Sequence, residues 1–358
     1  MIQSSTTRVE FSQNDMLAEP TLSPRLVDVA KKAGVSPATV SRVLNHSGQV
    51  NSLTRTRVLD AVEALGYVHS PTAPAVPASK TIAVFITDIL NPVFPEFLRG
   101  VEDEIGTQAV SIQIHNVPEN APSEKLLANV LGRSRLDGVI AFASHIEESE
   151  LLAVHSHYGL PLVVVNRRVS HPEIPSIVVD FEDAAYRSAR HLIGLGHSRI
   201  GFLAGLSASP TSTHRLHGIK RALAEIGQPL PEPWNIACFP NIDGGFQAMS
   251  RLLALPRQER PSALITYNDL LAFGALHAVR VHGLNVPDDL SVVGCDGIAL
   301  SAHSNPPLTT IEQPKYRMGR LAMQILARQM SEEAKGAGGY TLMESPLIIR
   351  ESTAVCSV

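Results

Sequence analysis

The chain has few cysteines, and they are far apart. Cys238, Cys295 and Cys356 are the only three in 358 residues, and no two of them form a C-x-x-C pair. Zinc sites and disulfide frameworks need paired or closely spaced cysteines, so the sequence predicts neither. Sparse, unpaired thiols are typical of proteins that stay in a reducing compartment.

Long apolar runs are also missing. Residues 1–23 include Glu10, Asp15 and Glu19 and contain no apolar run as long as that of a secretory signal. No stretch approaches the roughly 20 apolar residues that a membrane helix needs. We therefore expect a cytoplasmic protein with no membrane partner, in which residues 1–23 form a disordered arm.

Patterns for catalysis and metal binding are lacking as well. The fourteen histidines include no pair at ligand spacing with a third donor, which argues against a metal. No G-x-S-x-G elbow or serine, histidine and aspartate order is present. The glycines of residues 194–197 resemble a dinucleotide fingerprint, but they lead from a helix into a strand, the reverse of a phosphate-binding turn. The sequence predicts no catalytic residue, metal or cofactor, and hence no enzyme.

Residues 26–45 (LVDVAKKAGVSPATVSRVLN) predict two short helices joined by a tight turn. Apolar residues recur at i, i+3, i+4 and i+7 from Leu26, as on one face of a helix. Gly34 ends this helix, because glycine adopts the left-handed conformation without steric cost. Ser36 can cap the second helix, and Pro37 suits its first turn.

The second helix has an inward and an outward face. Val40, Val43 and Leu44 repeat the apolar spacing and should be buried. Small residues at the start of the outward face allow a close approach to a surface, and its arginine and asparagine are able to make paired hydrogen bonds with base edges. We expect the outward residues to read the major groove, although any amphipathic helix pair with a glycine turn looks similar. They are Ser36, Pro37, Ala38, Thr39, Ser41, Arg42 and Asn45.

The next segment extends this unit. Asn51 can cap a third helix with Val58, Ala61, Val62 and Leu65 as its buried stripe and Gly66 as its end. Residues 24–69 carry a net charge of +3 in a chain whose total is −4, so the remainder carries −7. This asymmetry is typical of a small module that binds a polyanion attached to a larger part with another task.

The signature D-V-A-x-x-A-G-V-S-x-x-T-V-S-R-V-L-N, present without gaps at residues 28–45, resembles the headpiece of the lactose-repressor/galactose-repressor (LacI/GalR) family. The similarity extends over nearly the whole chain from about Arg25 onward. It implies that Arg42 contacts base edges or nearby phosphate, and that Pro37 and Ala38 select the sequence. It also implies that Thr54 and Arg55 contact the DNA backbone.

Residues 70–80 form a proline-rich linker after the headpiece of residues 24–69. In the family this hinge forms a helix on the operator and inserts a leucine into the minor groove. Val76 occupies the place of that leucine, while Pro74 and Pro77 each remove a backbone donor. We therefore expect at most one turn of hinge helix and a weaker kink in the DNA.

From residue 81 to 358, apolar β-branched runs alternate with helical patterns. The runs cover residues 81–87, 138–143, 161–165, 199–204, 263–267 and 290–294. Such alternation predicts an α/β fold of doubly wound parallel sheets, and the length suits two lobes. The resemblance implies the periplasmic-binding-protein type I fold, with an N-lobe of residues 81–179 and 313–337 and a C-lobe of residues 180–312 and 338–358. It places the crossings near Val179, Glu312 and Gly338.

Ligands bind such sheets beyond the carboxyl ends of the strands. Asn91 beside Phe94 follows the first strand, and an amide next to an aromatic ring suits a hydroxylated ring, although a helix cap and a core phenylalanine fit equally well. The other candidates follow from position and resemblance: Arg167, Arg215, Phe239, Asn268, Asp296 and Gln313. Asp296 is the strongest, since the matching family aspartate accepts hydrogen bonds from the effector.

These observations predict a DNA-binding transcriptional regulator of the repressor type, acting as a homodimer on a double-stranded operator. A small-molecule effector, a sugar or sugar acid, would bind between the lobes and change operator affinity. The alternative is a sugar-binding receptor or an enzyme on the same two-lobed fold. A signal peptide or an acid/base pair in the cleft would favour that alternative, and the sequence contains neither.

Overall fold

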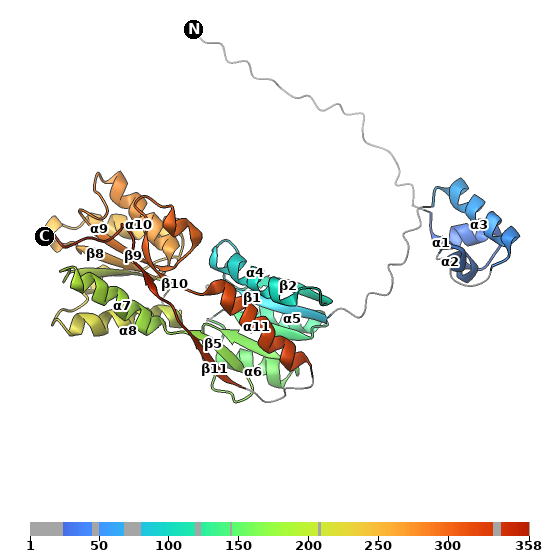
Figure 1. Cartoon of the computed structure of the whole chain (residues 1–358), viewed down its shortest axis with the longest axis horizontal. Helices are drawn as coiled ribbons and strands as arrows, with labels where there is room; N and C mark the ends of the chain where they lie inside the picture. The colour runs from blue at the N-terminus through green and yellow to red at the C-terminus, as the bar shows by residue number, and fades with distance from the viewer. Residues whose placement is uncertain are drawn as a thin grey trace, which may run out of the picture. The chain divides into compact units, whose positions relative to one another are not determined.

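The computed structural model describes residues 24–44, 50–67, 80–118, 123–143, 145–206, 209–331 and 338–357. The chain divides into two compact units, Met1–Ala78 and Ser79–Val358 (Figure 1). Among the described residues, no helix is both long and apolar enough to cross a membrane.

The described residues of the first unit form three helices, α1 (Leu26–Ala33), α2 (Pro37–Leu44) and α3 (Ser52–Leu65). Gly34 follows α1 with φ 66°, the left-handed conformation expected of a glycine at this position. Asn51 caps α3 by accepting a hydrogen bond from the Leu53 amide at 2.8 Å. The predicted inward residues Val40 and Val43 are buried.

The side chain of Arg57 connects α3 to the turn between α1 and α2. Arg57 of α3 donates a hydrogen bond from Nη2 to the Ala33 carbonyl at 2.5 Å, which satisfies a carbonyl at the end of α1. A Cβ at Gly34 would lie 2.6 Å from the same Nη2. Gly34 is therefore favoured for its backbone conformation, and a side chain at this position would push the end of Arg57 away from the Ala33 carbonyl.

The second unit is built on two sheets. The first, sheet A, has the strand order β11-β5-β4-β3-β1-β2, and every pairing in it is parallel. Helices α4 and α11 lie side by side on one face, although they are far apart in the sequence, and α5 and α6 cover the other face (Figure 1). The bounds are β1 (Lys80–Ile86), β2 (Val110–Asn116), β3 (Gly138–Phe142), β4 (Leu162–Val165), β5 (Pro175–Val179), β11 (Gly339–Met343), α4 (Val93–Ile105), α5 (Ser123–Arg133), α6 (Glu148–Ser156) and α11 (Lys315–Met330).

Sheet B has the order β12-β10-β9-β8-β6-β7 and is parallel except for β12. Helices α9 and α10 pack on one face, and α7 and α8 on the other. The bounds are β6 (Ile200–Ala204), β7 (Asn235–Ala237), β8 (Ala263–Thr266), β9 (Ser291–Asp296), β10 (Thr309–Glu312), β12 (Leu347–Ile348), α7 (Phe181–Gly194), α8 (Pro210–Ala224), α9 (Ile242–Leu253), α10 (Asp269–Val281) and the 3-10 helices η1 (Glu232–Trp234), η2 (Arg257–Glu259) and η3 (Ala299–Ala302).

The prediction of two doubly wound parallel sheets is confirmed, but one predicted crossing is wrong. Strand β11 pairs with β5 from Gly339↔Pro175 to Met343↔Val179, so it belongs to sheet A of the N-lobe. The chain therefore passes to the C-lobe after Met343, where β12 joins sheet B, and not near Gly338. Strand β11 does not appear as an apolar run in the sequence, because four of its five residues are exposed.

Candidate effector site and DNA-binding surface

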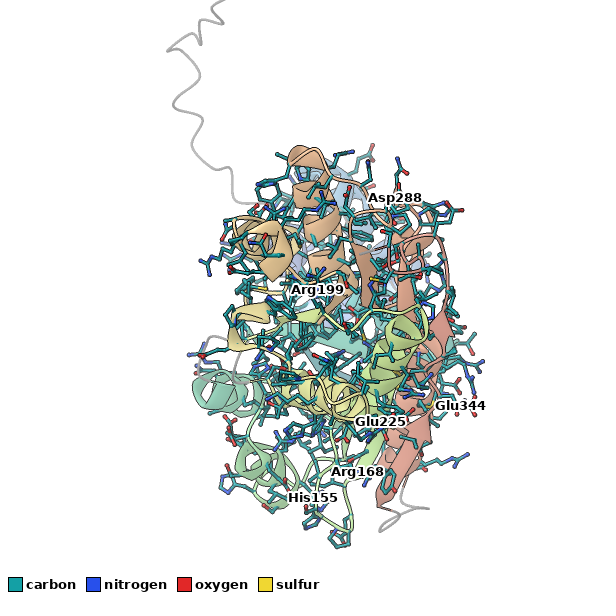
Figure 2. The ribbon with its side chains drawn as sticks, turned by 90° about the vertical axis from the view of Figure 1, so that its left-hand side faces the viewer. His155, Arg168, Arg199, Glu225, Asp288 and Glu344 are labelled. Atoms are coloured by element: carbon teal, nitrogen blue, oxygen red, sulfur yellow. The ribbon has the colours of Figure 1, made fainter. Side chains whose placement is uncertain are left out.

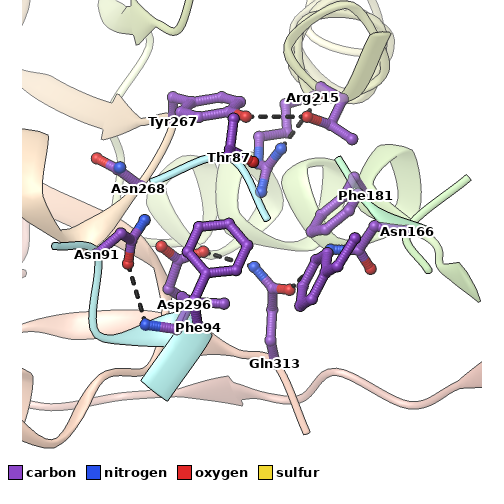
Figure 3. A pocket seen from close by; sticks show the side chains of 13 residues that line it. Thr87, Asn91, Phe94, Asn166, Phe181, Arg215, Tyr267, Asn268, Asp296 and Gln313 are labelled. Carbon is purple, nitrogen blue, oxygen red and sulfur yellow. Dashed lines mark hydrogen bonds between the residues drawn. The ribbon is translucent and has the colours of Figure 1, made fainter. Parts of the chain in front are cut away.

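The carboxyl ends of strands from both sheets meet around one small cavity of about 60 Å³ (Figure 3). Thr87 follows β1, Asn166 follows β4, Tyr267 follows β8 and Gln313 follows β10, while Asp296 ends β9. This is the edge at which doubly wound sheets bind ligands. The full lining is Thr87, Asn91, Val93, Phe94, Phe142, Asn166, Phe181, Thr211, Arg215, Tyr267, Asn268, Asp296 and Gln313.

Asp296 is held in an unusual backbone conformation at the base of this cavity. Its φ is 133°, a region that non-glycine residues rarely occupy and that surrounding contacts must maintain. The ammonium of the buried Lys315 donates to the carbonyls of Asp296 at 2.8 Å and Gly297 at 2.9 Å. Gln313 donates from Nε2 to Oδ1 of Asp296. These contacts fix the direction in which the carboxyl group points.

Burial raises the pKa of Asp296 to about 7, and the nearby charge of Asp269 adds to this effect. Asp269 is itself fully buried, and burial raises its pKa as well. Its carboxylate accepts hydrogen bonds from Thr310 Oγ1 at 2.6 Å, Ser301 Oγ at 2.7 Å and the Ile298 amide at 2.9 Å. Asp269 therefore supports the loop after β9, and Asp296 is the carboxyl group that faces the cavity.

Arg215 supplies the positive charge of the cavity. Its guanidinium lies between two rings, 3.9 Å from the centroid of Phe181 and 4.5 Å from that of Tyr267. It donates to the Thr211 carbonyl at 3.1 Å and to the Cys295 thiol at 3.4 Å. Burial opposes its charge, but Cys295 and Tyr267 outweigh this cost and raise its pKa. Within the part of the chain that the structure describes, Arg215 Nε has no hydrogen-bond partner, so one buried donor remains for a ligand.

Amides and aromatic rings complete the lining. Phe94 packs edge-on against Phe142 with their centroids 5.0 Å apart. Asn91 accepts a hydrogen bond from the Val93 amide at 3.0 Å, so its expected role as a helix cap coexists with its place in the cavity. Asn268 uses both ends of its amide within the protein, since Oδ1 accepts from the Leu271 amide and Nδ2 donates to the Pro240 carbonyl. Asn268 therefore has less bonding capacity left for a ligand than Asn91.

A wider space of about 700 Å³ adjoins the cavity and shares Thr87, Asn91, Phe94, Tyr267 and Asn268 with it. Exposed apolar side chains line it from both lobes: Leu90 is 83% exposed on the N-lobe, and Phe239 and Ile242 are 48% and 46% exposed on the C-lobe. Phe239 thus lies in this outer space and not in the inner cavity.

Most residues predicted for the effector site line one of these two spaces, but Arg167 does not. Its guanidinium donates to the Ile146 carbonyl and lies 3.8 Å from the Glu148 carboxylate, both on the N-lobe. Arg167 therefore lines neither space in this structure. Its neighbour Asn166, in the left-handed conformation with φ 62°, lines the cavity instead and donates to Gln313 Oε1 at 3.2 Å.

Further residues line the cavity that were not predicted from the sequence, among them Thr87, Phe181, Thr211 and Tyr267. Thr87, Asn166 and Tyr267 immediately follow strands, so the rule used for Asp296 would have found them. Phe181 is the first residue of α7 and Thr211 the second of α8, and only the fold brings these helix starts to the strand ends.

The predicted DNA-binding face of α2 is accessible. Ser36, Pro37, Ala38 and Arg42 are exposed, and Thr39 and Ser41 are half-buried. Ser36 Oγ accepts a hydrogen bond from the Thr39 amide at 3.2 Å and lies 2.9 Å from Thr39 Oγ1. On α3, Thr54 and Arg55 are half-buried. Asn45 and Val76, and with Val76 the predicted short hinge, fall outside the described residues.

Comparisons with known proteins cover both units. Residues 25–70 match the family described as bacterial regulatory proteins, lacI family, and residues 189–353 match the periplasmic binding protein-like domain. The HTH-type transcriptional repressor CytR of Escherichia coli (strain K12) is 36% identical over 329 residues, which cover 91% of this chain and 95% of CytR.

Two solved structures show the same fold. The transcriptional regulator CelR–cellobiose complex has a TM-score of 0.68 at 28% identity and covers 92% of this chain and 99% of its own. The lac repressor dimer bound to operator and the anti-inducer ONPF has a TM-score of 0.67 at 27% identity, with the same coverage. The chain belongs to the LacI family and is a DNA-binding transcriptional repressor whose operator affinity is controlled by a small-molecule effector.

Proposed function

We propose that the effector is a sugar or a sugar acid that binds in the cavity between the two lobes. The observation that carries this proposal is the pairing of buried Arg215 and Asp296 in one cavity with aromatic rings beside them. A sugar presents hydroxyl groups at its edges and apolar faces, which match such a lining. The similarity to a regulator in complex with cellobiose supports a carbohydrate ligand.

The wider outer space supports an effector larger than one ring. The inner cavity is small, whereas the adjoining space of about 700 Å³ has room for a second ring or an aglycone. Leu90 and Phe239 offer apolar surface to that second group. We place the polar part of the effector at Asp296 and Arg215. Its less polar part would lie in the outer space, between Leu90 of the N-lobe and Phe239 of the C-lobe.

For DNA binding, we propose that Arg42 contacts base edges or nearby phosphate. Ser36 and Thr39 contact phosphate or base, and Ser41 lies on the same face. Pro37 and Ala38 have no hydrogen-bonding side chain, so they are suited to contact thymine methyl groups. Thr54 and Arg55 bind the DNA backbone. Because one headpiece reads only part of a site, the repressor acts as a homodimer on a pseudo-palindromic operator in the cytoplasm.

The effector assignment is tested by thermal-shift measurements against a panel of sugars and sugar acids, including disaccharides. A ligand that binds only the folded state raises the melting temperature. We expect at least one compound to raise the Tm of the wild type, and Arg215→Ala to lose most of that shift relative to its own Tm without ligand. A panel without any hit, or a shift that Arg215→Ala retains in full, would reject the assignment.

The DNA-binding assignment is tested by gel-shift titration at several salt concentrations with Arg42→Ala. Losing one base-contacting arginine costs about 1–3 kcal/mol of discrimination between operator and random duplex. Arg257→Ala, a substitution of an exposed arginine on the C-lobe, serves as the matched control and should bind the operator like the wild type. Full operator specificity in Arg42→Ala would count against α2 as the recognition helix.

A further inference from the structure

We propose that His155, His171 and Glu173 form a binding site for a divalent transition metal of the Zn²⁺ class on the N-lobe. The three side chains come from α6 and from the segment just before β5. One potential ligand atom from each residue lies within 4.8 Å of the other two. His155 Nε2 and Glu173 Oε2 are 3.0 Å apart, and the two imidazole rings have centroids 5.3 Å apart.

The donor set determines the class of metal. Two imidazole nitrogens and one carboxylate oxygen suit Zn²⁺ and its neighbours, whereas Mg²⁺ and Ca²⁺ need oxygen ligands. In a tetrahedral zinc site, bonds of about 2.0–2.2 Å place the ligand atoms roughly 3.4 Å apart. The separation of 3.0 Å between His155 Nε2 and Glu173 Oε2 is close to this value, and the ligand atom of His171 lies within 4.8 Å of both, so side-chain rotations would bring it into place. A water molecule would take the fourth position, because the site is open to solvent.

Two existing contacts must give way when the metal binds. The ion takes the place of the proton between His155 Nε2 and Glu173 Oε2, which are 3.0 Å apart, and the second contact involves His171. The Glu173 amide donates to His171 Nδ1 at 3.3 Å, which is long for such a bond. Coordination through Nδ1 replaces this contact directly, and coordination through Nε2 places the proton on Nδ1. The loss is small, because this hydrogen bond is long and lies at an exposed residue.

The proposed metal site lies where strands of sheet A begin, whereas the effector cavity lies where they end. His155 is in the last turn of α6, which leads into β4, and Glu173 precedes β5, so both lie where these parallel strands begin. The effector cavity is at the ends of the same strands. His155 is labelled near the bottom of Figure 2. The site is therefore separate from the effector site.

Contacts around the site connect it to the beginning of β1. The Gln329 amide of α11 donates to the Glu173 carbonyl at 3.4 Å, and the next residue of α11, Met330, accepts a bond from Lys80 Nζ at 3.3 Å. Lys80 is the first residue of β1, directly after the linker. A metal ion that joins α6 to the segment before β5 would therefore stabilise the end of the N-lobe at which β1 begins.

The proposal is tested by titrating the full chain, freed of metal by chelator, with ZnCl₂ in a calorimeter. His155→Ala and His171→Ala should each lose one binding equivalent of Zn²⁺ or bind it at least about tenfold more weakly. His157→Ala is the matched control: it removes an exposed histidine two residues from His155, and it should titrate like the wild type. Equal titrations for all four proteins would overturn the site, as would the absence of any wild-type uptake.

A second measurement covers the case in which an alanine variant folds poorly. Glu173→Gln can keep the hydrogen bond to His155 but offers a weaker metal ligand. We expect Zn²⁺, and not Mg²⁺ at equal concentration, to raise the Tm of the wild type and of His157→Ala, with most of the rise lost in Glu173→Gln. A full rise in Glu173→Gln would contradict the site. Because neither readout needs effector or operator, the result is independent of the proposed function.

Discussion

If the proposed effector binds in the cavity, the protonation state of Asp296 should influence which class of effector binds better. With a pKa raised to about 7, its carboxyl group is mostly neutral below pH 7 and mostly ionised above it. The Arg215 guanidinium stays charged throughout this range. Below pH 7 the cavity therefore offers an uncompensated positive charge, and above pH 7 it offers a balanced pair.

The two candidate effector classes should respond to pH in opposite directions. A sugar acid remains ionised at pH 6 and is repelled by an ionised Asp296, so we expect its affinity to increase from pH 8 to pH 6. A neutral sugar that donates to the carboxylate should bind more weakly over the same change. Calorimetric titration at pH 6, 7 and 8 measures both trends.

Asp296→Asn is the control for this pH dependence. It keeps the size of the side chain and removes its titration, so effector affinity should be nearly constant between pH 6 and pH 8. A pH trend that persists unchanged in Asp296→Asn would assign the titration to another group.

Asp269 illustrates a buried carboxyl group whose function is structural. Asp269→Ala leaves the donors of Thr310, Ser301 and Ile298 without their acceptor, and each unsatisfied buried donor costs about 1–3 kcal/mol. We expect the free energy of unfolding to fall by about 3 kcal/mol or more, measured by urea titration. Asp269→Asn, which keeps an acceptor oxygen, should lose less. An alanine variant as stable as the wild type would show that the loop after β9 does not depend on Asp269.

At the scale of elements, the turn between α1 and α2 should be sensitive to one added methyl group. Gly34 and Gly66 have nearly the same positive φ, 66° and 61°, but only at Gly34 would a Cβ meet another group, Arg57 Nη2 at 2.6 Å. Gly66→Ala should therefore lower the free energy of unfolding only by the backbone strain, about 1–2 kcal/mol. Gly34→Ala should cost more, because it also displaces Arg57 from the Ala33 carbonyl.

Amide hydrogen exchange of residues 26–65 in the full chain measures this difference, because exchange reports local opening of the three-helix unit. We expect faster exchange in Gly34→Ala than in Gly66→Ala, with the second unit unchanged in both. Equal exchange in the two variants would mean that the hydrogen bond of Arg57 contributes little.

The sequence predicted those elements whose burial follows a simple period. The inward residues of α2 and the central strands β1, β3, β4, β6, β8 and β9 fall within or overlap the predicted ranges, since fully buried strands form continuous apolar runs. Edge strand β2 was missed because Gln113 and His115 interrupt its apolar residues, and β5 because it begins with a proline.

Helix α8 begins at Pro210 and continues through Gly218 to Ala224. A glycine inside a helix normally indicates an end, but here a Cβ at Gly218 would lie 2.0 Å from the Glu182 carbonyl of α7. The glycine serves the close packing of two helices, which sequence periodicity does not reveal.

At the effector cavity too, some features were predictable from the sequence and others were not. Asp296 and Gln313 were predictable from their positions at strand ends, whereas the direction of a side chain depends on its partners. Arg167 points to Ile146 and Glu148, and only the folded loop determines this. The cluster of His155, His171 and Glu173 has no regular spacing, because α6 and the segment before β5 bring it together.

For the whole molecule, a short chain of hydrogen bonds links the two lobes at the cavity. Asn166 of the N-lobe donates to Gln313, and Gln313 donates to Asp296 of the C-lobe. An effector that binds Asp296 competes for this chain or strengthens it. It changes operator affinity only to the extent that it binds the two lobe arrangements differently.

Gln313→Ala removes the middle of this chain, so we expect effector and operator binding to become less coupled. The ratio of operator Kd values with and without saturating effector, typically 5- to 150-fold in allosteric proteins, should move at least about fivefold closer to one. Fluorescence anisotropy with a labelled operator measures the ratio, and saturating effector prevents weaker effector binding from explaining the change. Gln228→Ala, an exposed substitution on the C-lobe, should keep the wild-type ratio. If Gln313→Ala also keeps it, the lobes communicate through their other crossings and not through this residue.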